Sequence, residues 1–330
     1  MDRFGGRKAA ADGGPLLAGL LAAYLCMIGG AMGETAGGRS SDVSIPGPEG
    51  PLRGTLEAPA SGDPRAAVLI LPGSGPTDRN GNAGPHYRTD LYRHLAADLA
   101  RQGIATLRID KRGVGGSARA VADGNAVTLA GYASDAAGWA AFLSSRTGRD
   151  CVWLLGHSEG GLVALKTAAS TSATVCGLML LATPGRPVGD VLRTQLRRMS
   201  HGEVLQWALG AVDSLEQGRR VDTADMHPGL APIFRDEVQD YLIDLLAHDP
   251  AAMLRAYAGP VLILQGEADG QVGAGDARRL AEARPDARLV MLPGVHHDMR
   301  TFDAVGPWRP DPDRGLDARV VAAISRFVLE

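Results

Sequence analysis

The feature that most constrains the fold is a glycine-flanked serine between an apolar run and a helical pattern. Val152–Leu155 predicts a buried strand, and Gly156-His157-Ser158-Glu159-Gly160-Gly161 follows it directly and opens the helical pattern of Gly160–Ser170. A G-x-S-x-G turn of this kind strains the serine backbone and leaves no room for side chains two residues away on either side. Glycines at 156 and 160 meet that requirement, so we expect a sharp strand–turn–helix unit with an exposed Ser158 hydroxyl.

Short apolar runs alternate with amphipathic, Ala-rich stretches along most of the chain. This alternation predicts an α/β fold, with a mostly parallel central sheet flanked by helices on both faces. A Gly/Ser/Pro-rich joint at about 37–51 should precede it. The expected strands are Leu52–Glu57, Ala67–Leu71, Ile104–Ile109, Val152–Leu155, Gly177–Leu181, Val261–Gln265 and Arg288–Leu292. The expected helices of the core are Tyr87–Gln102, Leu129–Arg146, Gly160–Ser170, Ala274–Ala283 and Leu316–Val328.

Residues 184–257 depart from this rhythm. They contain no convincing strand, and Val191–Met199, Val204–Leu215 and Val238–Leu246 have helical patterns separated by Gly and Pro breaks. We therefore expect a helical cap at 184–257, inserted into a core formed by 43–183 and 258–330. It should lie over the carboxyl ends of the strands, where ligands bind in open α/β sheets.

The N-terminus predicts export. Basic residues at 3, 7 and 8 precede an apolar run from Leu16 to Ile28 and then small residues, which is the layout of a cleavable signal peptide at 1–36. The run is shorter than the roughly 20 residues of a membrane-spanning helix, so no stable membrane span should remain. A net charge of −3 without a basic block gives no reason to expect nucleic acid as a partner.

Two cysteines, Cys151 and Cys176, remain after the leader. In an exported protein they could form a disulfide, and two buried free thiols are the alternative. Both cysteines should lie near the starts of neighbouring parallel strands, away from the edge that carries Ser158.

A serine hydroxyl needs a base to become a nucleophile, and the base needs a carboxylate to orient it. On this type of sheet the chain order is Ser, acid, His. That order leaves His296 and His297, in the loop after the last strand, as the candidate bases. The candidate acid is Asp269, which follows the preceding strand, with Glu267 as the alternative.

A negatively charged tetrahedral intermediate also needs backbone N–H donors. One should come from the residue after the nucleophile, Glu159. The second should come from the loop Leu71-Pro72-Gly73-Ser74-Gly75-Pro76 after an early strand. We assign Ser74 N–H to this oxyanion hole, with Gly75 next in line.

The chain resembles the α/β-hydrolase superfamily, in its serine aminopeptidase-like or lysophospholipase-like branch. The resemblance rests on Pro72 to Asn82, Asp110 to Ser117, Gly156 to Gly161, and Gly266 to Val272 with Leu292 to His297. It implies the α/β-hydrolase fold and a Ser-His-Asp triad, and it does not imply a substrate. Such relatives commonly end the last motif with Asn-His, so the resemblance favours His297 over His296 as the base.

The predicted function is hydrolysis of small-molecule carboxylic esters through Ser158, His297, Asp269 and an acyl-enzyme. One alternative is a peptidase for short peptides, in which Asp236, Glu237 or Asp240 would hold a substrate ammonium group. A second alternative is a catalytically inactive binding protein with the same fold. We expect no cofactor and no metal, since adjacent histidines point in different directions and no ligand spacing matches a zinc or calcium site. The sequence leaves the oligomeric state open.

Overall fold

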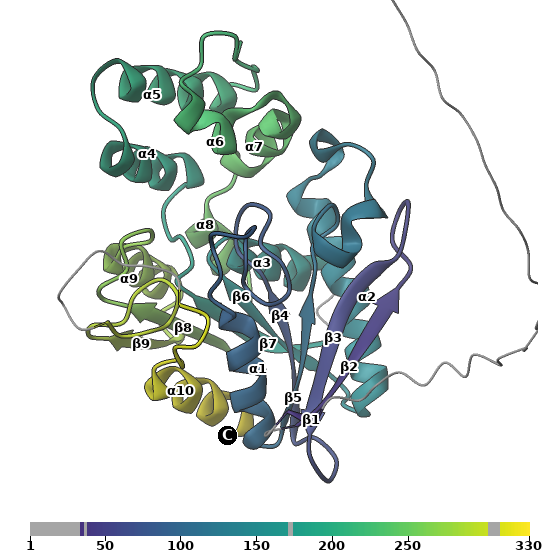
Figure 1. Cartoon of the computed structure of the whole chain (residues 1–330). Coiled ribbons are helices and arrows are strands. Elements are labelled where there is room, and N and C mark those ends of the chain that lie inside the picture. Colours follow the sequence, from purple (N-terminus) through teal and green to yellow (C-terminus); the bar gives the residue numbers. More distant parts are fainter. Residues whose placement is uncertain (1–33, 36–37, 171–173, 303–310) are drawn as a thin grey trace, which may run out of the picture. The chain divides into compact units, whose positions relative to one another are not determined.

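The computed structural model describes residues 34–35, 38–170, 174–302 and 311–330. Within them, nine strands form one sheet in the order β1-β2-β3-β5-β4-β6-β7-β8-β9 (Figure 1). Neighbours from β5 to β9 pair in parallel, whereas β1, β2 and β3 add antiparallel strands at one edge. The predicted mostly parallel sheet is confirmed. The strands are β1 Glu34–Thr35, β2 Gly38–Ile45, β3 Leu52–Pro59, β4 Ala66–Leu71, β5 Ile104–Ile109, β6 Val152–His157, β7 Val175–Leu181, β8 Val261–Gly266 and β9 Arg288–Leu292.

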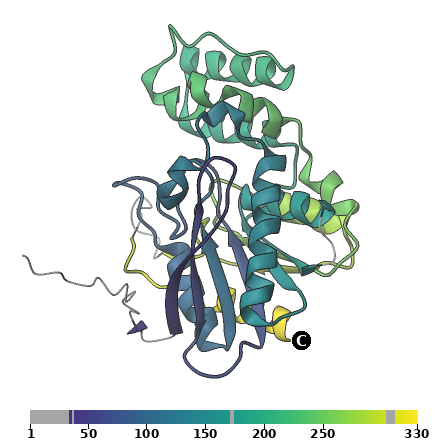
Figure 2. The same ribbon diagram turned by 90° about the vertical axis from the view of Figure 1, so that its right-hand side faces the viewer.

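Helices cover both faces of the sheet, because successive residues of a strand point to opposite sides. In β4, Val68 and Ile70 pack with α1 (Leu91–Arg101) and α10 (Ala318–Leu329). Leu69 and Leu71, which alternate with them, pack in a second core with helices that include α2 (Leu129–Thr147), α3 (Gly160–Ser170) and α9 (Ala274–Ala283). Figure 2 shows the long teal helix α2 running beside the strands, and in Figure 1 α2 and the yellow α10 lie on opposite sides of the sheet.

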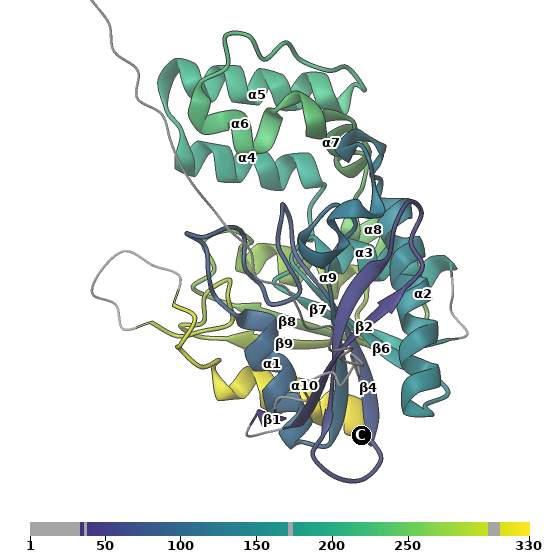
Figure 3. The same cartoon turned by 45° about the vertical axis from the view of Figure 1, so that its right-hand side comes forward.

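Five helices lie between β7 and β8. They are α4 Val188–Met199, α5 Gly202–Glu216, α6 Ala231–Phe234, α7 Gln239–Leu246 and α8 Pro250–Arg255. Residues of α4, α5, α6 and α7, with Leu230, form a separate apolar core that includes Leu196, Val212 and Phe234. Figures 1 and 3 show this group beyond the carboxyl ends of the parallel strands.

Two sequence predictions are corrected by the structure. The joint at 37–51 contains strand β2, all eight residues of which pair with β3. Four of its eight residues are exposed and three are half-buried, and it carries no apolar run, so its place in the sheet depends largely on its backbone hydrogen bonds. Helix α1 begins at Leu91 and not at Tyr87, because Asp90 has φ 47° and the Asn82 side chain accepts the N–H groups of Thr89 and Asp90.

The predicted signal peptide at 1–36 lies outside the described residues, apart from Glu34 and Thr35. Among the helices of the described part of the chain, none has the length and apolar character needed to cross a bilayer.

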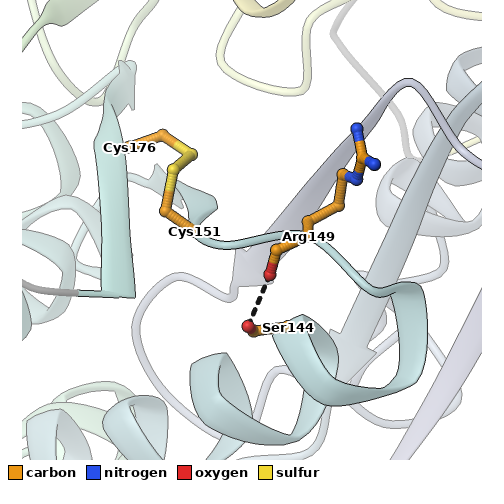
Figure 4. Close-up of a disulfide and its surroundings, with 4 residues drawn as sticks. All are labelled: Ser144, Arg149, Cys151 and Cys176. Carbon is orange, nitrogen blue, oxygen red and sulfur yellow. Dashed lines mark hydrogen bonds between the residues drawn. A yellow bond between two sulfur atoms is a disulfide. The ribbon is translucent and has the colours of Figure 1, made fainter.

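Cys151 and Cys176 form a disulfide, with their Cα atoms 5.2 Å apart (Figure 4). Cys151 immediately precedes β6 and Cys176 is the second residue of β7, so the bond joins the amino ends of two neighbouring strands. Ser158 follows the opposite, carboxyl end of β6. The question that the sequence left open is answered in favour of the disulfide.

We expect this bond to stabilise the fold without affecting the chemistry at the other edge of the sheet. Closing a loop across a separation of 25 residues should contribute about 3 kcal/mol to the free energy of unfolding. The double variant Cys151→Ser, Cys176→Ser should therefore melt about 5–10 °C lower while keeping its kcat at 25 °C. Calorimetry with and without reductant measures this effect, and an unchanged melting temperature in the double variant would contradict it.

Candidate active site

Ser158 lies in a tight turn between β6 and α3. Its φ is 54°, a left-handed conformation that is uncommon for a residue with a side chain. A Cβ atom on Gly156 would lie 2.3 Å from the Gly160 carbonyl oxygen, and one on Gly160 would lie 2.2 Å from the Leu71 carbonyl oxygen. Glycine is thus required at both positions, as the sequence predicts, and the turn is held against the end of β4.

The acid candidate Asp269 and the base candidate His297 are brought together by the loops after β8 and β9. His297 Nδ1 lies 2.7 Å from Asp269 Oδ2. The other carboxylate oxygen, Oδ1, accepts the backbone N–H groups of Gln271 at 2.7 Å and Val272 at 2.9 Å. The alternative acid, Glu267, is exposed.

The surroundings of Asp269 favour its charged form. Burial by itself raises the pKa of this carboxyl, but the His297 imidazole and the backbone N–H donors outweigh burial and hold the pKa below its ordinary value. An ionised Asp269 accepts the proton on His297 Nδ1. The neutral ring then has an unprotonated Nε2, which is the form a general base needs.

His296 has a different environment from its neighbour. Its ring packs edge-on against Phe302, with the ring centroids 5.2 Å apart, and it is only partly buried. The next carboxylate along the chain, Asp298, forms a buried ion pair with Arg300 at 3.3 Å. The structure therefore brings His297, and not His296, to Asp269.

The loop after β4 approaches the serine closely. A Cβ atom on Gly73 would lie 3.3 Å from the Ser158 Cβ, and Gly75 has φ +66°. Ser74, which lies between these two glycines, lines the same cavity as Ser158 and Glu159. Ser74 and Glu159, the two predicted N–H donors, thus both border the space beside Ser158.

A buried chain of hydrogen bonds connects this loop to His297, the candidate base. Gly73 N–H donates to the Tyr92 hydroxyl at 3.0 Å, Tyr92 contacts His157 Nδ1 at 2.9 Å, and His157 Nε2 lies 2.9 Å from the His297 carbonyl oxygen. A carbonyl can only accept, so Nε2 carries the proton and the Tyr92 O–H donates to Nδ1. Burial is the main cause that lowers the pKa of His157 to about 3, and a positive charge on the nearby His297 would act in the same direction, so the His157 ring stays neutral.

The sequence indicates no role for Tyr92 or His157. Tyr92 lies in an amphipathic helix, where an aromatic residue is an ordinary core residue, and His157 precedes Ser158, so the chain order Ser, acid, His excludes it as the base. The only available signal was a histidine next to the candidate nucleophile. Its partners lie 65 and 140 residues away along the chain.

A cavity of about 500 Å³ opens beside Ser158. Its wall consists partly of the core and partly of α4, α6 and α7, and most of the contributing side chains are apolar. They include Val127, Leu162, Val188, Val191, Leu192, Ile233, Val238, Leu242, Leu245, Leu246 and Val272. The charged residues of the wall are Lys111, Glu159, Arg112 and Arg235. Lys111 and Glu159 pair at 3.6 Å, and Arg112 pairs with Asp135 at 2.6 Å.

The doubly wound sheet and the serine turn at its carboxyl edge define the class of protein, a serine hydrolase with the α/β-hydrolase fold. Residues 63–227, which are 165 of the 330 residues, match the family model described as serine aminopeptidase, S33. The chain belongs to that family.

The sequence identity between this chain and individual relatives is low. The chain is 24% identical over 299 residues to esterase EstD of Thermotoga maritima, an alignment that covers 88% of this chain and 67% of the relative. Est1E from Butyrivibrio proteoclasticus has a similar structure, with a TM-score of 0.56 and 18% identity over 87% of this chain and 97% of the other. A malate-bound thermophilic esterase from Thermogutta terrifontis has a TM-score of 0.52 and 21% identity, again over 87% of this chain and 97% of the other. These structures share the fold of this chain.

Proposed function

We propose that this protein hydrolyses carboxylic esters with an apolar acyl or alcohol group, through an acyl-enzyme on Ser158. The observation that carries the proposal is the His297–Asp269 contact at 2.7 Å, on loops at the same sheet edge as the strained Ser158 turn. The name of the relative from Thermotoga maritima also supports ester hydrolysis.

The chemistry follows from these groups. Ser158 Oγ attacks the ester carbonyl carbon while His297 Nε2 takes the hydroxyl proton, and the N–H groups of Ser74 and Glu159 stabilise the oxyanion. The intermediate collapses, the C–O bond to the alcohol breaks, and His297 returns the proton to the leaving alcohol. Water then attacks the acyl-enzyme with the same base, which releases a carboxylic acid and regenerates Ser158.

Mass spectrometry tests this proposal directly. Acid quenching of the enzyme during turnover of a p-nitrophenyl ester should trap an acyl adduct on the peptide that contains Ser158. Turnover without any adduct on that peptide, or with an adduct on another serine, would refute the acyl-enzyme mechanism proposed here.

The cavity supports an apolar substrate group. Each methylene moved from water into it is worth about 0.8 kcal/mol, so kcat/KM should rise roughly 3- to 4-fold per added methylene until the cavity is filled. We expect p-nitrophenyl butyrate and hexanoate to be better substrates than the acetate.

A matched pair of variants on α4 checks that this cavity holds the acyl chain. Leu192 lines the cavity and Met199 is 62% exposed. Leu192→Trp should shift the optimum to shorter chains, whereas Met199→Trp should leave the chain-length profile unchanged. A flat chain-length series in the unmodified protein, or the same shift in both variants, would argue against this binding mode.

The peptidase alternative receives less support. Asp240 accepts the Arg220 Nε–H at 2.7 Å, Asp236 accepts the Thr223 hydroxyl at 3.0 Å, and Glu237 is exposed. The cavity wall as described contains Arg235 and Val238 but none of these carboxylates. Glu159, which does line it, is already paired with Lys111. Release of p-nitroanilide from aminoacyl substrates at a rate comparable with ester cleavage would reverse this preference.

Export and the role of 184–257 as a cap remain proposals. The disulfide supports export, because such bonds persist mainly in oxidising compartments. The shared cavity wall supports a cap role for the helices of this segment.

The rival function of an inactive binding protein predicts no adduct in the acid-quench experiment.

A further inference from the structure

The Lys111 ammonium group is buried beside the oxyanion loop and has no role in the mechanism above. It follows β5 in the sequence Asp110-Lys111-Arg112-Gly113, one of the stretches that carry the family resemblance. Both the Lys111 and the Glu159 side chains are 5% exposed. Placing an ammonium in such a site costs free energy unless its N–H groups find partners.

One of those partners is the Gly73 carbonyl. Lys111 Nζ donates to this oxygen at 2.6 Å, while the Gly73 N–H donates to the Tyr92 hydroxyl. The Gly73 carbonyl and the Ser74 N–H belong to the same peptide group. In a planar trans peptide the C=O and N–H bonds point in opposite directions, so fixing the carbonyl also fixes the direction of the Ser74 N–H.

The other partner of Lys111 is the side chain of Glu159, with Nζ 3.6 Å from Oε1. Nζ also lies 5.5 Å from the centroid of the Tyr132 ring. A single ammonium therefore contacts the peptide group that carries the Ser74 N–H and also the side chain of Glu159, whose own N–H is the other donor of the proposed oxyanion hole. It reaches Ser74 through the preceding carbonyl and Glu159 through its carboxylate.

From these contacts we propose that Lys111 is a positioning residue of the oxyanion hole, which orients and polarises the Gly73–Ser74 peptide group. The assignment rests on the proposed function, because it needs the Ser74 N–H to meet the oxyanion. A cation on the carbonyl draws electron density from the N–H side and makes the Ser74 N–H a stronger donor. Burial lowers the pKa of Lys111 and the Glu159 carboxylate opposes that shift, so the carboxylate helps to keep the charge in place.

A purely structural role for Lys111 makes different predictions. If Lys111 only fastens the loop, its loss should lower the melting temperature and leave the balance between kcat and KM unchanged. If it orients an oxyanion donor, its loss should lower kcat and weaken the binding of a charged tetrahedral analogue. KM should then change little, because the ground-state carbonyl depends less on this donor.

The test compares Lys111→Met with the double variant Lys111→Met, Glu159→Gln. The single variant leaves a buried carboxylate unpaired, and the double variant removes that complication. Lys166→Met on α3, outside the cavity wall, is the matched control. Removal of a whole oxyanion donor typically costs about 100- to 1000-fold in kcat. Misorientation of one should cost about 10- to 100-fold, in both Lys111 variants and with KM within about 3-fold of the unmodified enzyme.

A trifluoromethyl ketone supplies the second measurement, because its adduct with the serine places a negative oxygen in the oxyanion hole. Its Ki should rise in parallel with the loss of kcat/KM. Full recovery of kcat in the double variant, or an unchanged Ki, would overturn the assignment. Failure of the proposed function itself would be recognised separately, since the unmodified protein would then not react with a fluorophosphonate.

Discussion

Ser158→Ala should abolish labelling by a fluorophosphonate and lower kcat by about 10⁵- to 10⁶-fold, because only binding and oxyanion stabilisation would remain. The substitution removes the one hydroxyl in the strained turn at φ 54° and does not alter the glycines that shape it. Its effect on the melting temperature should be small. The measurements are gel fluorescence of the labelled protein and initial rates with a p-nitrophenyl ester.

Ser170→Ala is a suitable control, since Ser170 is the last residue of α3 and is exposed. This variant should be labelled as fast as the unmodified protein. Labelling that survives in Ser158→Ala, at any other serine, would remove Ser158 from the mechanism.

The second large effect concerns the two adjacent histidines. His297→Ala removes the ring that contacts Asp269 at 2.7 Å and should lower kcat by about 10⁴-fold or more, the scale expected for a triad base. His296→Ala removes a ring that packs on Phe302 and should keep kcat within about 10-fold. Steady-state kinetics of the two variants at equal folded concentration, verified by circular dichroism, would separate them.

The opposite ranking would transfer the role of base to His296. Equal losses in both variants would indicate that the loop is disturbed as a unit. A third variant, His296→Asn, distinguishes these cases, because it creates the Asn-His pair that the family resemblance leads us to expect and should not lower kcat further than His296→Ala.

The sequence predicted those helices and strands whose buried apolar residues repeat at regular spacing. Helix α9 begins and ends at the predicted residues, since the buried Ala277 and Leu280 repeat at helical spacing between a Gly-rich loop and Pro285. Strand β2 was missed because it lies near the edge of the sheet and its partly exposed, polar sequence contains no apolar run. The predicted start of α1 was wrong by four residues. The side-chain amide of Asn82 accepts the backbone N–H of Asp90, 8 residues later in the chain, and so fixes the turn that precedes the helix.

The site was predictable to the level of chain order. Order alone left His296 and His297 open, since a loop after a strand does not reveal which of two adjacent rings faces inward. The contacts of Lys111 and Tyr92 could not be predicted for another reason. Lys111 contacts Gly73 from the loop after β5 and Tyr92 contacts it from α1, 38 and 19 residues away respectively, and no local pattern in the sequence indicates contacts over such separations.

The helices between β7 and β8 have a consequence for protein engineering. The backbone N–H of Val188, at the start of α4, donates to the carbonyl oxygen of His248, just after α7, at 3.2 Å, so the chain enters and leaves the α4–α7 segment at adjacent places. The intervening residues also have an apolar core of their own. They could thus be exchanged as a cassette between related enzymes. Such a chimera would change half of the cavity wall while inheriting its serine turn, acid and base from the recipient.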